Sequence, residues 1–223
     1  MATNRKISFR DGEIYHLFNR GLERKCTFTN KREFERAKKL IKFYRHKEIP
    51  VRFSQVLKQP EDTRTRILND LFQSERAVDI LSYCLMPNHF HFLIKQNTGK
   101  GASTFVANFT NAYTKYFNVK HQRIGPLFEG IFKAVYIEND EQLIHVSRYI
   151  HLNPIASSLI QDDELNDYPW SSYREYLSLS EDEIAQKDLV LGMFKSINHY
   201  QKFLTDQIDY AKKLESIKHL VLE

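Results

Sequence analysis

The chain is poor in cysteine and has no long hydrophobic run. Its 223 residues include only Cys26 and Cys84, which form neither a zinc-binding spacing nor a disulfide framework, so we expect two buried thiols. No segment approaches the roughly 18 apolar residues that a membrane helix needs. Residues 1–6 lead into polar sequence without the apolar core of a secretory signal. These absences predict a cytoplasmic protein that has no membrane partner.

The charge balance is only moderately basic. Lysine and arginine number 33 against 28 aspartate and glutamate residues, which gives a net charge of +5. Such a balance is compatible with nucleic-acid binding but is also common in proteins that bind no nucleic acid. The length fits one domain with an appendage or two small domains. We find no internal repeats and no low-complexity segments.

Hydrophobic periodicity predicts alternating strands and helices. Strands are predicted at 13–20, 77–86, 89–95 and 127–137, and helices at 31–47, 61–72, 102–118 and 139–152. Pro154 is expected to end the last of these helices. Residues 177–223 read as a helical appendage without a sheet of its own. The charged side of the helix at 31–47 fits either solvent exposure or contact with a DNA backbone.

Two histidines alternate on one predicted strand. In His89-Phe90-His91, both imidazoles point to the same face, about 7 Å apart along the strand, while Phe90 points to the other. Imidazole is a common ligand of catalytic metals, so both rings could reach one ion. The alternative is a pair of histidines that happen to alternate on a half-exposed strand.

One tyrosine lies outside the expected apolar stripe of its helix. Tyr149 lies beside the stripe of the 139–152 helix rather than within it, with His145 and Asn153 four residues before and after it. A hydroxyl there can face a site while the Asn153 amide oxygen reaches the same ion. The alternative is a partly buried surface aromatic. Four other tyrosines are expected to pack, two in the core and two in an aromatic corner: Tyr113, Tyr116, Tyr168 and Tyr173.

Four ordered motifs resemble one known family. They are YHLFNRG at 15–21, LMPNHFHFL at 85–93, RYIHLNP at 148–154 and YPWSSY at 168–173. Together they resemble the single-tyrosine transposases of the HUH superfamily, especially the REP-associated group, over roughly residues 13–176. The resemblance implies an α+β fold with a ferredoxin-like (RRM-like) antiparallel sheet and helices packed on it. It also implies a catalytic domain at 1–176, followed by a C-terminal helical extension at 177–223.

The resemblance also assigns roles to residues. His89 and His91 match the metal ligands, Tyr149 matches the nucleophile, and Asn153 matches a position that can supply a third ligand. The implied cofactor is a divalent metal, Mg²⁺ or Mn²⁺, of which Mn²⁺ suits imidazole ligands better. The metal would polarise the scissile phosphate. His145 is a candidate base for the Tyr149 phenol, which is mostly protonated at neutral pH.

The implied activity is cleavage and rejoining of single-stranded DNA through a 5′-phosphotyrosine intermediate. Relatives act beside hairpins formed by imperfect palindromes, as a monomer or a homodimer. Candidate DNA contacts are basic side chains at Arg20, Lys38, Lys42 and Lys133, together with the basic end segment 211–219. Relatives usually carry Gly-Arg where this chain has Gly130 followed by Ile131, which puts the substrate preference of the relatives in doubt.

Two other functions remain open from the sequence. One is a catalytically silent relative that binds hairpin DNA or RNA as a regulator. The other is a metal-dependent phosphodiesterase or RNase in which water replaces Tyr149 as the nucleophile.

Overall fold

The computed structural model of the chain describes residues 8–213. Expectations about residues 1–6, and about residues 214–219 of the basic end segment, lie outside this range. The strands are β1 (Ile14–Arg20), β2 (Val78–Met86), β3 (His89–Gln96) and β4 (Lys133–Tyr136). The longer helices are α1 (Lys31–Tyr44), α3 (Glu61–Gln73), α4 (Gly101–Lys120), α5 (Asp140–Ala156) and α8 (Ile197–Thr205). Short helices are η1 (Leu22–Arg24), α2 (Phe53–Val56), η2 (Asp162–Asp167), α6 (Tyr173–Tyr176) and α7 (Asp188–Leu191).

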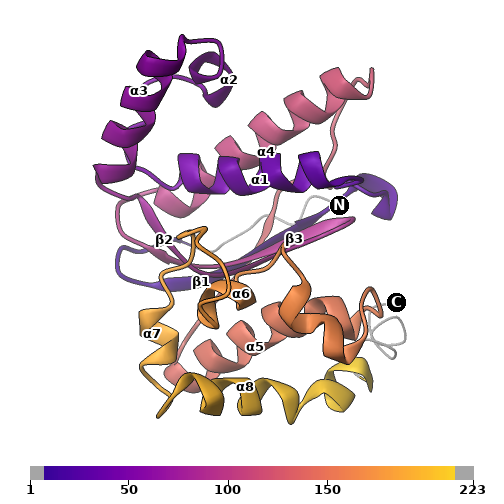
Figure 1. The fold of residues 1–223 in the computed structure, drawn as a ribbon. Helices are drawn as coiled ribbons and strands as arrows, with labels where there is room; N and C mark the ends of the chain where they lie inside the picture. Colours follow the sequence, from indigo (N-terminus) through magenta and orange to yellow (C-terminus); the bar gives the residue numbers. More distant parts are fainter. Residues whose placement is uncertain (1–7, 214–223) are drawn as a thin grey trace.

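Within residues 8–213 the strands form one four-stranded sheet in the order β2-β3-β1-β4. Every neighbouring pair is antiparallel. With α2 and α3 inserted after α1, the sequence β1-α1-β2-β3-α4-β4 is the ferredoxin-like βαββαβ arrangement. Helices α1 and α4 cover one face of the sheet, and α5 to α8 lie on the other side (Figure 1). The expected fold class is therefore confirmed.

Strand alternation divides the interior into two cores. On β3, Phe90, Phe92 and Ile94 are fully buried in the cluster that also contains the apolar stripes of α1 and α4. Leu93 belongs to the second cluster, which is built with α5 and the C-terminal helices. Because side chains of a strand point alternately to the two faces, this division leaves His89 and His91 on the α5 side.

A buried polar network fixes α5 against the sheet. The Ser147 hydroxyl on α5 lies 2.9 Å from that of Ser82 on β2 and 3.0 Å from that of Tyr200 on α8. One turn later, the His151 ring lies between Tyr200 Oη and Ser172 Oγ, at 2.7 Å from each. Buried polar groups are costly unless they are paired, so this network favours one rotation of α5 over all others.

The segment after Tyr176 contacts the edge of the sheet as well as α5. Ala185 forms a parallel bridge with Ile80 of β2, and the Gln186 amide donates to the Ile80 carbonyl at 2.7 Å. Tyr168 and Tyr173 are buried beside this edge, as expected for an aromatic corner. The 177–213 part of the expected extension is thus helical and docked on the second core.

Three local expectations were wrong. The expected strand 127–137 is interrupted at Gly130, which has a positive φ of 37°, so only Lys133–Tyr136 pairs as β4. Helix α5 continues past Pro154 to Ala156, because a proline in the last turn removes only one hydrogen bond. Cys26 is exposed, whereas Cys84 is buried as expected.

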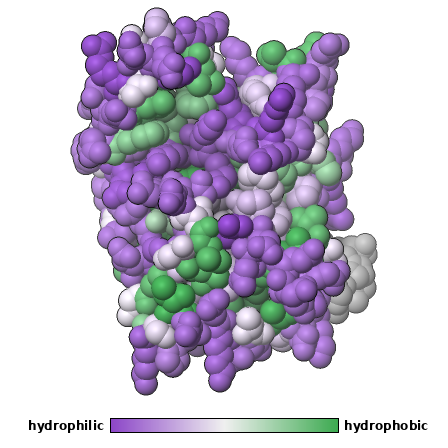
Figure 2. All heavy atoms as spheres, viewed as in Figure 1, coloured by the Kyte–Doolittle hydropathy of each residue, from purple (hydrophilic) through white to green (hydrophobic). Residues whose placement is uncertain are grey.

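The visible surface is mostly hydrophilic, with small, separate hydrophobic groups (Figure 2). Across the described range, the helices are all too short or too polar to cross a membrane.

Buried histidines, among them His46 and His151, make folding sensitive to acid. Burial lowers the pKa of His46 to about 4 and that of His151 to about 3, both below the unfolded value of about 6.5. Between these values the unfolded chain holds protons that the native chain does not, so stability falls as the pH drops below about 6.5. We expect the free energy of unfolding, measured with urea, to fall by about 1.4 kcal/mol per pH unit for each such proton.

The slope of the unfolding free energy against pH gives the number of protons that the chain takes up when it unfolds. The substitution His46→Gln should lower this number near pH 5.5 by about one. His199→Gln, at an exposed position, should leave it unchanged. Equal slopes in wild type and His46→Gln would contradict this assignment.

Candidate active site

Strands β1 and β3 form the floor of the site, which is the face of the sheet that carries His89 and His91. Arg20 is paired with His89, and Phe18 with His91, so these four side chains share the face that α5 covers. Lys133 of β4 is paired with Phe18, so His91, Phe18 and Lys133 form one row across the sheet, which we call the His91 row. The structure therefore brings two of the candidate DNA contacts, Arg20 and Lys133, to the same face as the histidines.

The imidazole of His89 is held from both sides. Its Nδ1 lies 2.6 Å from Asn88 Oδ1 and its Nε2 lies 3.0 Å from Asn153 Oδ1 on α5. Asn88 is itself tied to the end of β1, because the Gly21 amide donates to the Asn88 carbonyl at 2.6 Å. A Cβ on Gly21 would lie 2.1 Å from the Lys25 carbonyl oxygen, so only glycine fits there. The β2–β3 turn is thereby fixed beside His89.

The imidazole of His91 lies deeper, with 5% of the residue exposed. Its Nε2 is 3.5 Å from Asn153 Nδ2, and its Nδ1 is 2.9 Å from His16 Nε2. Burial lowers the pKa of His16 to about 4, so this ring is neutral at pH 7. Sequence reasoning missed His16, although it stands in the YHLFNRG motif. Strand alternation fixes its face, but only the β1–β3 register places it beside His91.

Helix α5 brings Tyr149 and Asn153 onto this floor. The Tyr149 ring meets the His91 ring edge-on at a centroid distance of 5.4 Å, and the His16 ring at 6.0 Å. Asn153 follows one helical turn later and is 4% exposed. The structure thus assembles Tyr149, Asn153, His89 and His91 from one helix and one strand.

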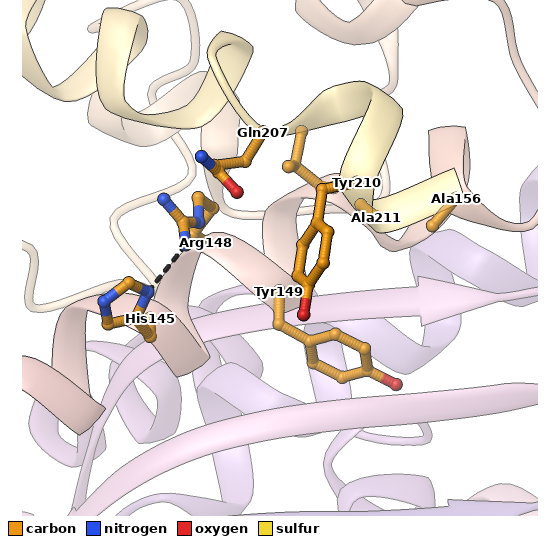
Figure 3. A pocket seen from close by; sticks show the side chains of 8 residues that line it. His145, Arg148, Tyr149, Ala156, Gln207, Tyr210 and Ala211 are labelled. Carbon is orange, nitrogen blue, oxygen red and sulfur yellow. Dashed lines mark hydrogen bonds between the residues drawn. The ribbon is translucent and has the colours of Figure 1, made fainter. Parts of the chain in front are cut away.

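His145 lies on the other side of Tyr149. It lines a pocket between α5 and residues 207–211, together with Arg148, Tyr149 and Tyr210. In Figure 3 the Tyr149 hydroxyl points toward the sheet, away from His145, whose Nδ1 contacts Arg148 Nη2 at 2.6 Å. The structure therefore does not bring the candidate base to the phenol.

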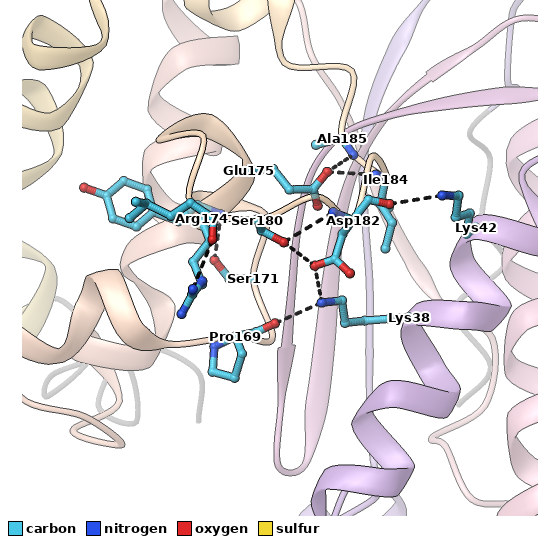
Figure 4. A network of polar contacts seen from close by, with 12 residues as sticks. Lys38, Lys42, Pro169, Ser171, Arg174, Glu175, Ser180, Asp182, Ile184 and Ala185 are labelled. Carbon is cyan, nitrogen blue, oxygen red and sulfur yellow. Dashed lines mark hydrogen bonds and ion pairs between the residues drawn. The ribbon is translucent and has the colours of Figure 1, made fainter.

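Lys38 and Lys42 are engaged within the chain. Lys38 forms an ion pair with Asp182 and donates to the Pro169 carbonyl at 3.3 Å, and Lys42 donates to the Asp182 carbonyl at 3.3 Å (Figure 4). Both belong to α1, on the face of the sheet opposite to the histidines. The structure therefore does not bring these two candidate DNA contacts to the site.

The comparisons with known proteins point to one family. Residues 49–153 match the family described as Transposase IS200 like. This segment is similar to the IS200-like transposases. It runs from before β2 to Asn153 and so contains His89, His91 and Tyr149. At the level of a transposase, which cuts DNA and transfers strands, the expected class of enzyme is confirmed.

A solved structure shares the fold of the matched segment and its flanks. It is that of a REP-associated tyrosine transposase bound to a REP hairpin, with 16% sequence identity and a TM-score of 0.54. The match covers 83% of this chain and 92% of that one. A search of curated proteins found no match.

Metal dependence is general among transposases of this family. In the described part of the chain, no group of three or more His, Cys, Asp or Glu side chains is placed to hold a metal ion. The candidate site on β3 and α5 offers instead two imidazoles and one amide, with the Asn153 amide between His89 Nε2 and His91 Nε2. Because the Asn88 oxygen can only accept, a neutral His89 carries its proton on Nδ1 and turns the Nε2 lone pair toward the Asn153 oxygen. These donors fit a divalent cation whose remaining ligands are water or phosphate oxygens.

Charge at position 153 should therefore control metal affinity. We expect Asn153→Asp to tighten Mn²⁺ binding by about tenfold, because a carboxylate adds charge to two neutral imidazole donors. Asn153→Ala should weaken it, because an oxygen donor is lost. Isothermal titration with Mn²⁺ measures both, and equal affinities in the two variants would exclude this residue as a ligand.

Proposed function

We propose that this protein cuts and rejoins single-stranded DNA, with Tyr149 as the nucleophile. The observation that supports this most directly is the placement of Tyr149 and Asn153, on adjacent turns of α5, against the two histidines of β3. A tyrosine that only packed would have no need of polar neighbours. Here its ring packs against the second core and also lies edge-on to the buried rings of His16 and His91.

The proposed chemistry is a transesterification at phosphorus. The Tyr149 oxygen forms a bond to the scissile phosphorus while the bond from phosphorus to the 3′-oxygen breaks. The phenol loses its proton to water, and the departing oxygen takes up one proton from water and becomes a free 3′-hydroxyl, so the protons balance. The 5′-phosphotyrosine keeps the energy of the phosphodiester, so attack by a 3′-hydroxyl on that phosphorus restores a continuous strand and releases Tyr149 without ATP.

We assign the metal to His89, His91 and Asn153. A divalent cation, Mg²⁺ or Mn²⁺, would supply charge neutralisation at the scissile phosphate when bound there. The residues themselves orient the site, because Asn88 and His16 hold the two imidazoles from behind. Asn153 faces both rings from α5, one turn after Tyr149, so the nucleophile and the proposed metal ligands lie close together.

The proposed substrate is a DNA strand beside a hairpin. A transposase with this fold was solved with a REP hairpin. On this chain, Phe18 and Lys133 continue the His91 row outward over the sheet, and the Lys133 side is exposed. An aromatic ring beside a cation suits base stacking together with phosphate contact. We propose residues 1–176 as the catalytic domain and 177–223 as its helical extension.

A covalent-adduct assay tests the nucleophile. Labelled single-stranded hairpin DNA is incubated with the protein and Mn²⁺ and then separated on a denaturing gel. We expect wild type to carry the label, and Tyr149→Phe to lose it by at least 10³-fold, because no other group replaces the attacking oxygen. Tyr210→Phe, which alters the other tyrosine of the same pocket, should keep the adduct.

Other outcomes identify other functions. Cleavage that is equal in wild type and Tyr149→Phe would show that water is the nucleophile. Hairpin binding without any adduct, over a range of hairpins, would show a silent DNA-binding protein.

The DNA-contact assignment predicts a difference between lysines. Lys133→Ala should weaken hairpin binding and lower the slope of log K against log salt by about 0.7 to 0.9, the value for one lost phosphate contact. Lys42→Ala should change neither, because this side chain contacts Asp182 and Glu183. Fluorescence anisotropy at several salt concentrations measures both, and a larger effect of Lys42→Ala would reverse the assignment.

A further inference from the structure

The hydrogen bond between two buried imidazoles points to a role for His16. We propose that His16 is a positioning residue that keeps the proton of His91 on Nδ1 and so directs the Nε2 lone pair of His91 toward Asn153. The assignment rests on the proposed function, because it takes His91 Nε2 as a metal donor, but the tautomer of the His91 ring is measured without metal or DNA.

The direction of the hydrogen bond follows from the proposed role of His91. A neutral imidazole has one N–H donor and one acceptor nitrogen. His91 Nε2 faces Asn153 at 3.5 Å, where the cation is proposed to bind, and a nitrogen that binds a cation must offer its lone pair. Nδ1 therefore carries the proton, which is donated to His16 Nε2 at 2.9 Å. His16 in turn carries its own proton on Nδ1.

The orientation of the His16 ring is fixed by packing. It stacks on Phe18 with 4.9 Å between centroids and 29° between planes, and it meets Tyr149 edge-on at 6.0 Å. His16 is 8% exposed, so water has little access to compete for its Nε2. An acceptor held in this way defines both the tautomer and the rotation of the His91 ring.

The two histidines of β3 are thus held by different groups. His89 has the Asn88 side-chain oxygen behind its Nδ1, at 2.6 Å on the turn. His91 lies too deep in the sheet for a turn residue, and the adjacent strand β1 supplies an imidazole instead. In metal sites, a partner behind each ligating histidine is the rule, and loss of one typically weakens binding 10- to 100-fold.

The test compares two replacements of His16. His16→Phe keeps a ring of similar size but removes the acceptor, whereas His16→Gln places an amide oxygen near the former Nε2. Long-range ¹H–¹⁵N NMR spectra of the protein without added metal report which His91 nitrogen carries the proton. We expect the Nδ1–H form in wild type and in His16→Gln, and a mixture of tautomers in His16→Phe. His46→Gln, at a buried histidine near the end of α1, is the control and should match wild type.

The second readout is binding of Mn²⁺ alone, measured by isothermal titration. We expect His16→Phe to lose 10- to 100-fold in affinity and His16→Gln to stay within about threefold of wild type. A role in packing alone would make the two variants equal, with matching melting temperatures and no change in the His91 spectrum. That result, or a His91 tautomer unchanged in His16→Phe, overturns the proposal.

The two proposals fail in different ways. A wild type that shows no Mn²⁺ binding and no DNA adduct counts against the proposed function. The His91 tautomer in wild type and in His16→Phe still decides whether His16 sets it.

Discussion

The rotation of α5 about its own axis is the constraint on which the whole site depends. Successive residues of a helix are separated by about 100°, so Tyr149 and Asn153 face the histidines only in one rotation. Ile150 and Leu152 point in different directions from α5, and both are buried. Apolar contacts alone would therefore allow α5 to turn slightly about its axis at a modest cost in free energy. The hydrogen bonds of Ser147 and His151 with Ser82, Ser172 and Tyr200 remove that freedom. Any other rotation would leave several of these buried polar atoms unpaired.

The C-terminal helices therefore contribute to the site by holding α5 in place. Tyr200 of α8 bonds to both Ser147 and His151, and α8 is held in turn by the second core. The ferredoxin-like sheet with α1 and α4 could bury one face by itself, but the other face would stay open. Helices α5 to α8 close that second face over its apolar part. Beside the buried His91, they leave Phe18 partly exposed and Lys133 exposed at the side of β4.

Sequence patterns predicted what depends on local periodicity. Alternation on β3 placed His89 and His91 on one face, and helical spacing separated Tyr149 from the stripe of α5. The patterns could not predict contacts between distant segments. His16 needs the β1–β3 register, and the pairing of Lys38 and Lys42 with Asp182 joins residues about 140 positions apart. The break at Gly130 depends on a backbone conformation that composition does not specify.

An amide at position 153 suits the proposed chemistry better than a carboxylate would. The three proposed ligands, two imidazoles and an amide, are all neutral, so a bound divalent cation keeps its full charge toward the substrate. A phosphate oxygen then becomes the strongest ligand within reach, and binding of metal and of DNA favour each other. A carboxylate would hold the cation more tightly but would cancel part of the charge that the scissile phosphate needs. The amide also lies within reach of both imidazoles, at 3.0 Å from His89 Nε2 and 3.5 Å from His91 Nε2, so one cation could contact all three side chains.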